Sequence, residues 1–230
     1  MSIDIGGTGI KMMVLDAAGK PLNRHARELT PKPAHPPAVL AVIESMLERQ
    51  PPFERVSVGF PGVVQNGITR NAPNLDNPSW TDFPLERRLR ALVHRPVRVI
   101  NDADLLGYAV VRGRGLEMVI TLGTGMGTAL FLDGKLVPNL ELGHHPLHQG
   151  KTYEDRISDA VLKRIGKKRW LKRVWKAIQR LEPTFNYDAL YVGGGNARLL
   201  GNELPPKVEL FDNAKGLQGG IRLWAKSGTR

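Results

Sequence analysis

Short apolar runs alternate along this chain with segments whose apolar residues recur every three or four positions. The runs predict strands at residues 12–15, 97–100, 117–122 and 129–132. The helical spacing predicts helices at residues 36–50, 80–93 and 103–111. Strands and helices are therefore interspersed, as in α/β proteins.

The first predicted turn combines glycines with groups that bind phosphate. A short strand carries Asp4, turns through Gly6, Gly7 and Thr8, and continues into a second strand at Lys11. Adjacent glycines let backbone N–H groups approach a ligand, and an aspartate before the turn can hold Mg²⁺ or its waters. An ordinary hairpin turn is the alternative. The spacing is not that of a Walker loop, and a strand follows instead of a helix.

The same design returns about 120 residues later. A predicted strand turns through Gly123, Thr124 and Gly125 into another strand. Two such hairpins facing each other across a cleft would hold the two ends of a phosphate chain. A third cluster, with Gly194 and Gly195, follows another strand and is expected to open a helix, a normal place for an anion.

The chain is strongly basic, and the excess charge is concentrated in one segment. Lys and Arg number 33 against 22 acids, giving a net charge of +11. Apolar spacing over residues 160–181 predicts an amphipathic helix, with Gly166 as its weak point. A solvated face normally mixes signs, so a face without acids favours an anion-binding surface for polyphosphate, nucleic acid or an acidic membrane. Its nine cations are Lys163, Arg164, Lys167, Lys168, Arg169, Lys172, Arg173, Lys176 and Arg180.

The motifs, taken in order, resemble one enzyme family. D-I-G-G-T-G-I-K at residues 4–11, V-I-N-D-A at 99–103, L-G-T-G-M-G at 122–127, E-L-G-H at 141–144 and V-G-G-G at 192–195 resemble the ROK family of sugar kinases. The run E-L-G-H-H-P followed by K-T-Y-E-D, without any cysteine, is most similar to the polyphosphate glucokinases.

The resemblance implies an α/β, two-lobed actin-like (ribonuclease-H-like) fold with a cleft between the lobes. The N-terminal lobe is expected to hold residues 1–100 and a helix at about 216–230. The C-terminal lobe is expected to hold residues 101–215, with the basic helix at 160–181.

Asn101 and Asp102 follow a β-branched strand, where α/β folds place ligand sites. Phosphoryl transfer to a hydroxyl needs a carboxylate that orients the hydroxyl and accepts its proton. Asp102 is the candidate base, and Asn101 is a candidate hydrogen-bonding partner for the sugar. A helix N-cap is the alternative reading from the residues alone, and the resemblance favours catalysis.

Glu141 and His144 are separated by a glycine that permits a turn, so both can reach vicinal hydroxyls. Metal binding by these residues and the neighbouring histidines is the competing idea, but the spacing fits no familiar metal helix. The resemblance implies that Glu141 and His144 bind sugar, with Glu154 as the nearest counterpart of a further glutamate. It also matches Gly62 and Asn74 to a sugar-side loop. The zinc loop of the wider family is missing from this chain. Whether Glu154 takes the sugar-binding role of the further glutamate is therefore an open question at this point.

The function that the resemblance implies is a glucokinase that transfers a phosphoryl group from polyphosphate, and also from ATP, to O6 of glucose. We expect Mg²⁺ as cofactor, no zinc, and a homodimer without membrane or nucleic-acid partners. Lys163, Lys167, Lys168, Lys172 and Arg173 are the expected polyphosphate path. A strictly ATP-dependent ROK hexose kinase is one alternative. A non-catalytic polyanion- or nucleic-acid-binding protein is another, and retention of Asp102 and both hairpins argues against it.

The absence of cysteine excludes disulfides and a cysteine zinc site, and suits a reducing cytoplasm. No apolar run approaches the ~20 residues that span a bilayer, and the start lacks a signal-peptide pattern. Only three residues precede Asp4, so we expect that a few residues precede Met1.

Overall fold

The computed structural model describes residues 1–75 and 77–225. The chain forms two compact units. The first contains Met1–Ala109 and the C-terminal segment that starts at Ala214, and the second is Val110–Asn213. In the described part of the chain, no helix has both the length and the apolarity needed to cross a membrane.

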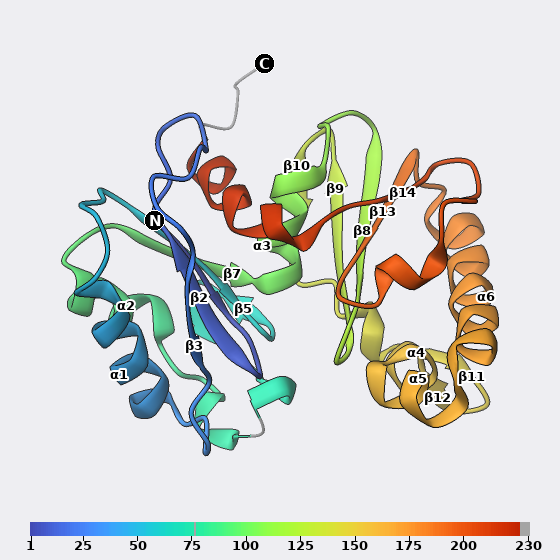
Figure 1. Cartoon of the computed structure of the whole chain (residues 1–230), viewed down its shortest axis with the longest axis horizontal. Coiled ribbons are helices and arrows are strands. Elements are labelled where there is room, and N and C mark those ends of the chain that lie inside the picture. The colour runs from blue at the N-terminus through green and yellow to red at the C-terminus, as the bar shows by residue number, and fades with distance from the viewer. Residues whose placement is uncertain (76, 226–230) are drawn as a thin grey trace. The chain divides into compact units, whose positions relative to one another are not determined.

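The first unit is built on a five-stranded mixed sheet with the strand order β3-β2-β1-β4-β7. Strands β1, β2 and β3 are antiparallel, whereas β4 and β7 run parallel to β1. Every residue of β4 is buried because helices cover both faces of the sheet (Figure 1). Its elements are β1 (Ser2–Ile5), β2 (Gly9–Met13), β3 (Ala26–Leu29), α1 (Pro36–Leu47), β4 (Val56–Phe60), β5 (Val64–Gln65), β6 (Ile68–Thr69), α2 (Leu85–Val93), β7 (Val97–Asn101) and α3 (Asp102–Val110).

The second unit repeats this arrangement, with the strand order β10-β9-β8-β13-β14. Strands β8, β9 and β10 are antiparallel, and β13 and β14 run parallel to β8 and β13 respectively. A glycine hairpin therefore joins the first two strands of each sheet. The elements are β8 (Leu116–Leu122), β9 (Met126–Leu132), β10 (Lys135–Val137), β11 (Pro146–His148), β12 (Lys151–Thr152), α4 (Tyr153–Ile157), α5 (Asp159–Ile165), α6 (Lys167–Phe185), β13 (Ala189–Gly193) and β14 (Val208–Leu210).

Short 3₁₀ segments complete both units. The described ones are η1 (Pro73–Leu75), η2 (Pro78–Trp80), η3 (Leu142–His144), η4 (Ala197–Leu200) and η5 (Asn213–Trp224). The long helix expected at 160–181 is divided into α5 and α6 at Gly166, which has φ 78°. The helix expected after Gly194 and Gly195 is only the single 3₁₀ turn η4.

Two expected boundaries in the first unit differ from the structure, and a third differs at the C-terminal segment. The division expected after residue 100 precedes α3, but α3 belongs to the first unit because Leu105 packs against Gly59 of β4. The helix expected from residue 80 begins at Leu85, because Trp80 closes η2 and donates from Nε1 to the Ala34 carbonyl over 2.7 Å.

The helix expected at 216–230 is the 3₁₀ segment η5, which ends at Trp224; residues 226–230 lie outside the described residues. Segment η5 is held on β4 through Ser57. The Ser57 hydroxyl donates to the Gly220 carbonyl over 2.7 Å and accepts from Trp224 Nε1 over 2.8 Å. The C-terminal segment is therefore part of the first unit's core packing.

A buried carboxylate anchors the start of the second sheet. The side chain of Glu117 accepts hydrogen bonds from the backbone N–H groups of Arg112, Gly113 and Arg114 over 2.6, 2.6 and 3.1 Å. It also accepts from the Tyr191 hydroxyl over 2.9 Å. Four donors compensate for the loss of hydration, so this burial is structural.

Candidate functional site

The first glycine hairpin joins β1 and β2. The Gly6 N–H donates to the Gly9 carbonyl over 3.0 Å and closes the turn. Lys11 Nζ lies 2.9 Å from a carboxylate oxygen of Asp4, and both side chains are partly exposed. A methyl group at Gly7 would lie 2.6 Å from the Asn74 carbonyl oxygen, so a side chain is excluded there. The structure thus brings the predicted phosphate hairpin and the Asn74 loop together.

Asn101 and Asp102 lie where β7 ends and α3 begins. Asn101 Oδ1 accepts from the Ala103 and Asp104 N–H groups over 2.8 and 3.2 Å, which makes Asn101 the N-cap of α3. Its Nδ2 donates to the Gly62 carbonyl over 3.2 Å. Asp102 is the first helical residue, half-buried, and its Oδ1 accepts from Ala103 N–H over 2.8 Å. The capping role thus belongs to Asn101, and a sugar contact by Asn101 stays a prediction.

The second hairpin meets the third glycine cluster. The Gly123 N–H donates to the Gly125 carbonyl over 3.1 Å, a shorter span than in the first hairpin. The Asn196 N–H donates to the Leu122 carbonyl over 3.0 Å, and Gly194, at φ 93°, lies so close to Leu122 that no side chain fits. Thr124 is exposed at the tip of the turn.

Asp159 links these loops, a role that the sequence alone did not reveal. Its N–H donates to the Gly123 carbonyl over 2.8 Å, and its carboxylate accepts from Asn196 Nδ2 over 3.2 Å. The same carboxylate lies 2.7 Å from Lys163 Nζ. Lys163, expected on the polyphosphate path, therefore has a local counterion.

Glu141, His144 and Glu154 gather around the second hairpin. A carboxylate oxygen of Glu154 accepts from the Met126 N–H over 3.2 Å, and its carboxylate fills the space beside Gly125. His144 Nε2 lies 3.6 Å from a Glu141 carboxylate oxygen. Burial raises the pKa of Glu141, the charge of His144 lowers it, and the charge of Glu154 raises it again. The two carboxylates are therefore close enough to influence each other.

This cluster is tied to β9 by the turn that carries it. The Thr128 hydroxyl donates to the Leu140 carbonyl, and the Leu142 N–H donates to the same hydroxyl over 3.3 Å. The structure thus places Glu154 near enough to Glu141 for their charges to interact, and its sugar-binding role stays a prediction. Two acceptor side chains and an imidazole in one place suit recognition of vicinal hydroxyls.

No group of three or more His, Asp or Glu side chains suited to a metal ion occurs among the described residues. A magnesium ion bound together with substrate phosphates needs only one or two protein carboxylates, because waters and phosphate oxygens complete its shell. Asp4, beside the glycine turn, fits that requirement.

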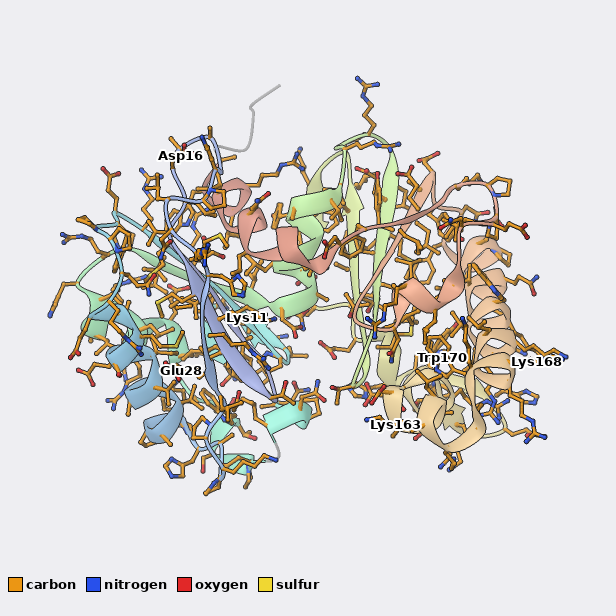
Figure 2. The ribbon with its side chains drawn as sticks, in the orientation of Figure 1. Lys11, Asp16, Glu28, Lys163, Lys168 and Trp170 are labelled. Carbon is orange, nitrogen blue, oxygen red and sulfur yellow. The ribbon has the colours of Figure 1, made fainter. Side chains whose placement is uncertain are left out.

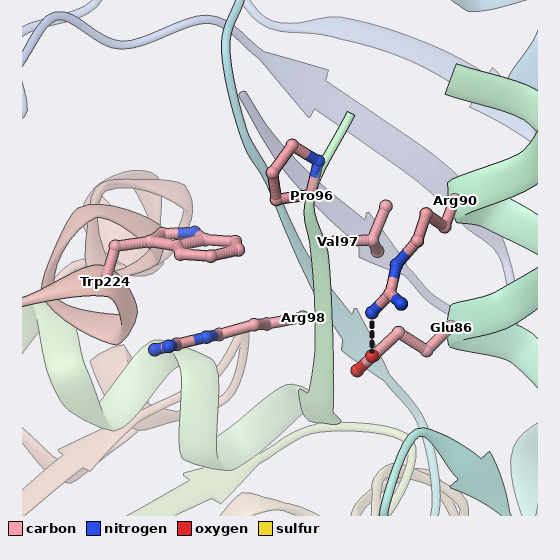
Figure 3. Close-up of a pocket in the computed structure, with 6 residues that line it drawn as sticks. All are labelled: Glu86, Arg90, Pro96, Val97, Arg98 and Trp224. Atoms are coloured by element: carbon pink, nitrogen blue, oxygen red, sulfur yellow. Dashed lines mark hydrogen bonds and ion pairs between the residues drawn. The ribbon is translucent and has the colours of Figure 1, made fainter. Parts of the chain in front are cut away.

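A separate hollow lies at the edge of the first sheet (Figure 3). It has a volume of about 520 Å³. The Arg98 guanidinium stacks on the Trp224 ring, 4.4 Å from its centroid, and donates to the Leu223 carbonyl. These contacts fasten η5 to β7, and none of the expected site residues lines the hollow. Its lining residues are Glu86, Arg90, Pro96, Val97, Arg98 and Trp224.

Comparison with known proteins gives consistent matches. The ROK family model matches residues 1–155. The polyphosphate glucokinase of Mycobacterium leprae is 33% identical over 234 residues, which cover 94% of this chain and 72% of that protein. The polyphosphate glucokinase of Mycobacterium tuberculosis is 32% identical, with 94% and 88% covered.

Solved structures give the same result. The inorganic polyphosphate/ATP-glucomannokinase from Arthrobacter sp. strain KM superposes with a TM-score of 0.85 at 34% identity, with 96% of each chain covered. A ROK family glucokinase from Streptomyces griseus, in complex with glucose and AMPPNP, has a TM-score of 0.77 at 22% identity and shows the shared fold. The expected α/β actin-like fold is confirmed. The chain belongs to the ROK family.

Proposed function

We propose that this protein is a glucokinase that transfers a phosphoryl group from polyphosphate, and also from ATP, to O6 of glucose. The observation that carries the proposal is the position of Asp102, the first residue of α3, directly after strand β7 and beside the helix cap Asn101. Similarity to polyphosphate glucokinases over 94% of the chain supports the choice of substrates.

Asp102 is proposed to orient the glucose O6 hydroxyl and accept its proton as the phosphoryl group arrives. Glu141, His144 and Glu154 are proposed to hydrogen-bond the sugar hydroxyls, and Asn74, Gly62 and Asn101 to contribute from the first unit. Carboxylates and an imidazole accept or donate in the directions that ring hydroxyls require.

The two glycine hairpins are proposed to bind the donor phosphates. The first contributes Asp4, Gly6, Gly7, Thr8 and Lys11; the second contributes Gly123, Thr124 and Gly125, with Gly194 and Gly195 beside it. Mg²⁺ is the proposed cofactor, held by Asp4 through water, and when bound it neutralises charge on the phosphates. The cationic face of α5 and α6 is proposed to receive the longer donor.

The test is an assay that couples glucose 6-phosphate formation to NADP⁺ reduction by a dehydrogenase. Purified protein is mixed with glucose, Mg²⁺ and either polyphosphate or ATP, with EDTA as the metal-free control. The proposal is supported if polyphosphate gives turnover and EDTA abolishes that turnover. Turnover with ATP alone supports the strictly ATP-dependent kinase, and no turnover with either donor refutes glucokinase activity.

Two further properties remain predictions. A homodimer is expected, and light scattering after gel filtration would measure the mass in solution. A cytoplasmic location is expected, and cell fractionation would test it.

A further inference from the structure

The cations of α6 form two adjoining groups. Residues three, four, seven or eleven positions apart share one side of a helix. Lys168 and Lys172, here called the lysine pair, are centred about a quarter of the way round the helix from the other group, and Lys172 adjoins Lys176. Lys168 points outward on the side opposite Trp170 (Figure 2). The other group, here called the arginine row, contains Arg169, Arg173, Lys176 and Arg180.

Other elements bring more cations to the arginine row. Arg180 donates to the Leu147 carbonyl, which fastens α6 to β11. Partial burial and the charges of Arg156 in α4 and Arg164 in α5 lower the pKa of Arg173. Together with Arg173 of α6, these cations come from three different helices, so a sequence scan of one helix does not reveal the surface.

His148 of β11 lies at the same surface. Desolvation, followed by the positive charges of Lys176, Arg156 and Arg180, lowers the pKa of this imidazole. The cross-strand partner of His148 on β12 is Lys151. The name cationic track is used below for Arg156, Arg164, Arg173, Lys176, Arg180 and His148.

Three acidic residues close in sequence to the cationic track make contacts with other groups. The Asp155 carboxylate accepts from Thr152 N–H over 3.0 Å, Asp159 pairs with Lys163, and Glu182 lies 3.4 Å from Lys207 Nζ. Among the ion pairs between described residues, none includes a member of the cationic track. Like charges so close together repel, so a bound polyanion would lower the energy of this surface.

We propose that long inorganic polyphosphate lies along the cationic track and not along the lysine pair. The inference rests on the proposed function and names the residues that would hold the polymer. Planar guanidinium groups bind phosphate oxygens in a bidentate manner, which suits a track rich in arginine. Nucleic acid fits less well because Trp170 is fully buried and Trp175 is partly buried against the core, which limits the faces available for base stacking.

Helix α4 connects the track to the site. Glu154 contacts the second hairpin through Met126 N–H, and Arg156 follows two residues later on the track. A polymer on the track therefore has its near end within one helical turn of the residues around the hairpin.

The first experiment compares two double variants of α6 that remove equal charge. Arg173→Gln with Lys176→Gln changes the track, and Lys168→Gln with Lys172→Gln changes the lysine pair. We expect the track variant to raise KM for long polyphosphate about tenfold and the lysine-pair variant less than about threefold. The track variant should also reduce the slope of log affinity against log salt by about 1 to 2. Thermal unfolding midpoints of both variants report whether the fold is intact.

A larger KM increase in the lysine-pair variant, or equal increases in both, would overturn the assignment. Equal losses with polyphosphate and with ATP would also overturn it, since they would mean a structural role for this face. Single-stranded DNA that binds the track as tightly as polyphosphate at equal salt would replace the proposal with a nucleic-acid surface.

The second experiment does not depend on activity. The ring resonances of His148, assigned by comparison with His148→Gln, are titrated by NMR with and without long polyphosphate. The polymer should raise the pKa of His148 because it offsets the charges of Lys176, Arg156, Arg180 and Lys151. His94, exposed in the first unit, should not respond. If polyphosphate binds measurably but the pKa of His148 does not change, the proposed track is refuted. A raised pKa in a protein without glucokinase turnover supports the track and refutes only the proposed function.

Discussion

Asp102→Asn separates catalysis from stability. The substitution keeps the size of the side chain and an oxygen that can accept from Ala103 N–H, but removes the basic carboxylate. Loss of general base catalysis should lower kcat about 10²–10⁴-fold, which corresponds to roughly 3–5 kcal/mol of activation free energy. Glucose should still bind.

The effect of Asp102→Asn on unfolding should be small. Asn101 supplies the cap of α3, so the main expected loss is that of a negative charge near a helix N-terminus, worth about 0.3–1 kcal/mol. Asn101→Ala is the matched comparison. It removes the cap and the bond to the Gly62 carbonyl, and should destabilise the protein by about 2 kcal/mol.

The coupled glucose 6-phosphate assay gives kcat, calorimetry gives glucose binding, and urea unfolding gives stability for both variants. Near-normal kcat in Asp102→Asn would refute the role as base. A loss of 2 kcal/mol or more in the unfolding free energy of Asp102→Asn would show that this carboxylate, and not Asn101, holds the helix.

Three further predictions follow from buried and partly buried polar groups. Glu141→Gln should weaken glucose binding, seen as a KM increase, yet raise the thermal midpoint at neutral pH. The reason is that a raised folded-state pKa makes the ionised carboxylate a cost above its unfolded pKa. Glu117→Gln replaces an accepting carboxylate oxygen with an NH₂ group that would face backbone N–H donors. The unfolding free energy measured in urea should fall by about 3 kcal/mol. Burial raises the pKa of Tyr187 and Tyr191 to about 12. Stability should therefore hold below pH 10 and fall between pH 10 and 12, and phenolate absorbance should rise over the same range.

Features encoded within a few residues could be predicted from the sequence. Both glycine hairpins lie between antiparallel strands, as the apolar runs on either side indicated. Asn101 and Asp102 end a strand and begin a helix, because β-branched residues give way to cap-forming ones. The break at Gly166 also followed from the pattern, since a glycine at positive φ ends α5.

Features that depend on contacts between distant segments could not be predicted. The sequence suggested a helix after residue 216, but a methyl group at Gly219 would lie 2.1 Å from the Leu105 carbonyl oxygen. Tight packing on α3 thus accompanies a 3₁₀ segment in place of the expected helix. The contact of Glu154 with Met126 spans 28 positions, and no local pattern reports it.

Helix α4 carries residues of two different surfaces of the second unit. Thr152 and Asp155 form a capping box: the Thr152 N–H donates to Asp155 over 3.0 Å, and the Asp155 N–H donates to Thr152 over 3.1 Å. These bonds fix where the helix begins. Residues two apart in a helix point to nearly opposite sides, so fixing the start directs Glu154 to the hairpin and Arg156 to the cationic track. The capping box therefore orients both a proposed sugar-binding residue and a residue of the proposed polymer path.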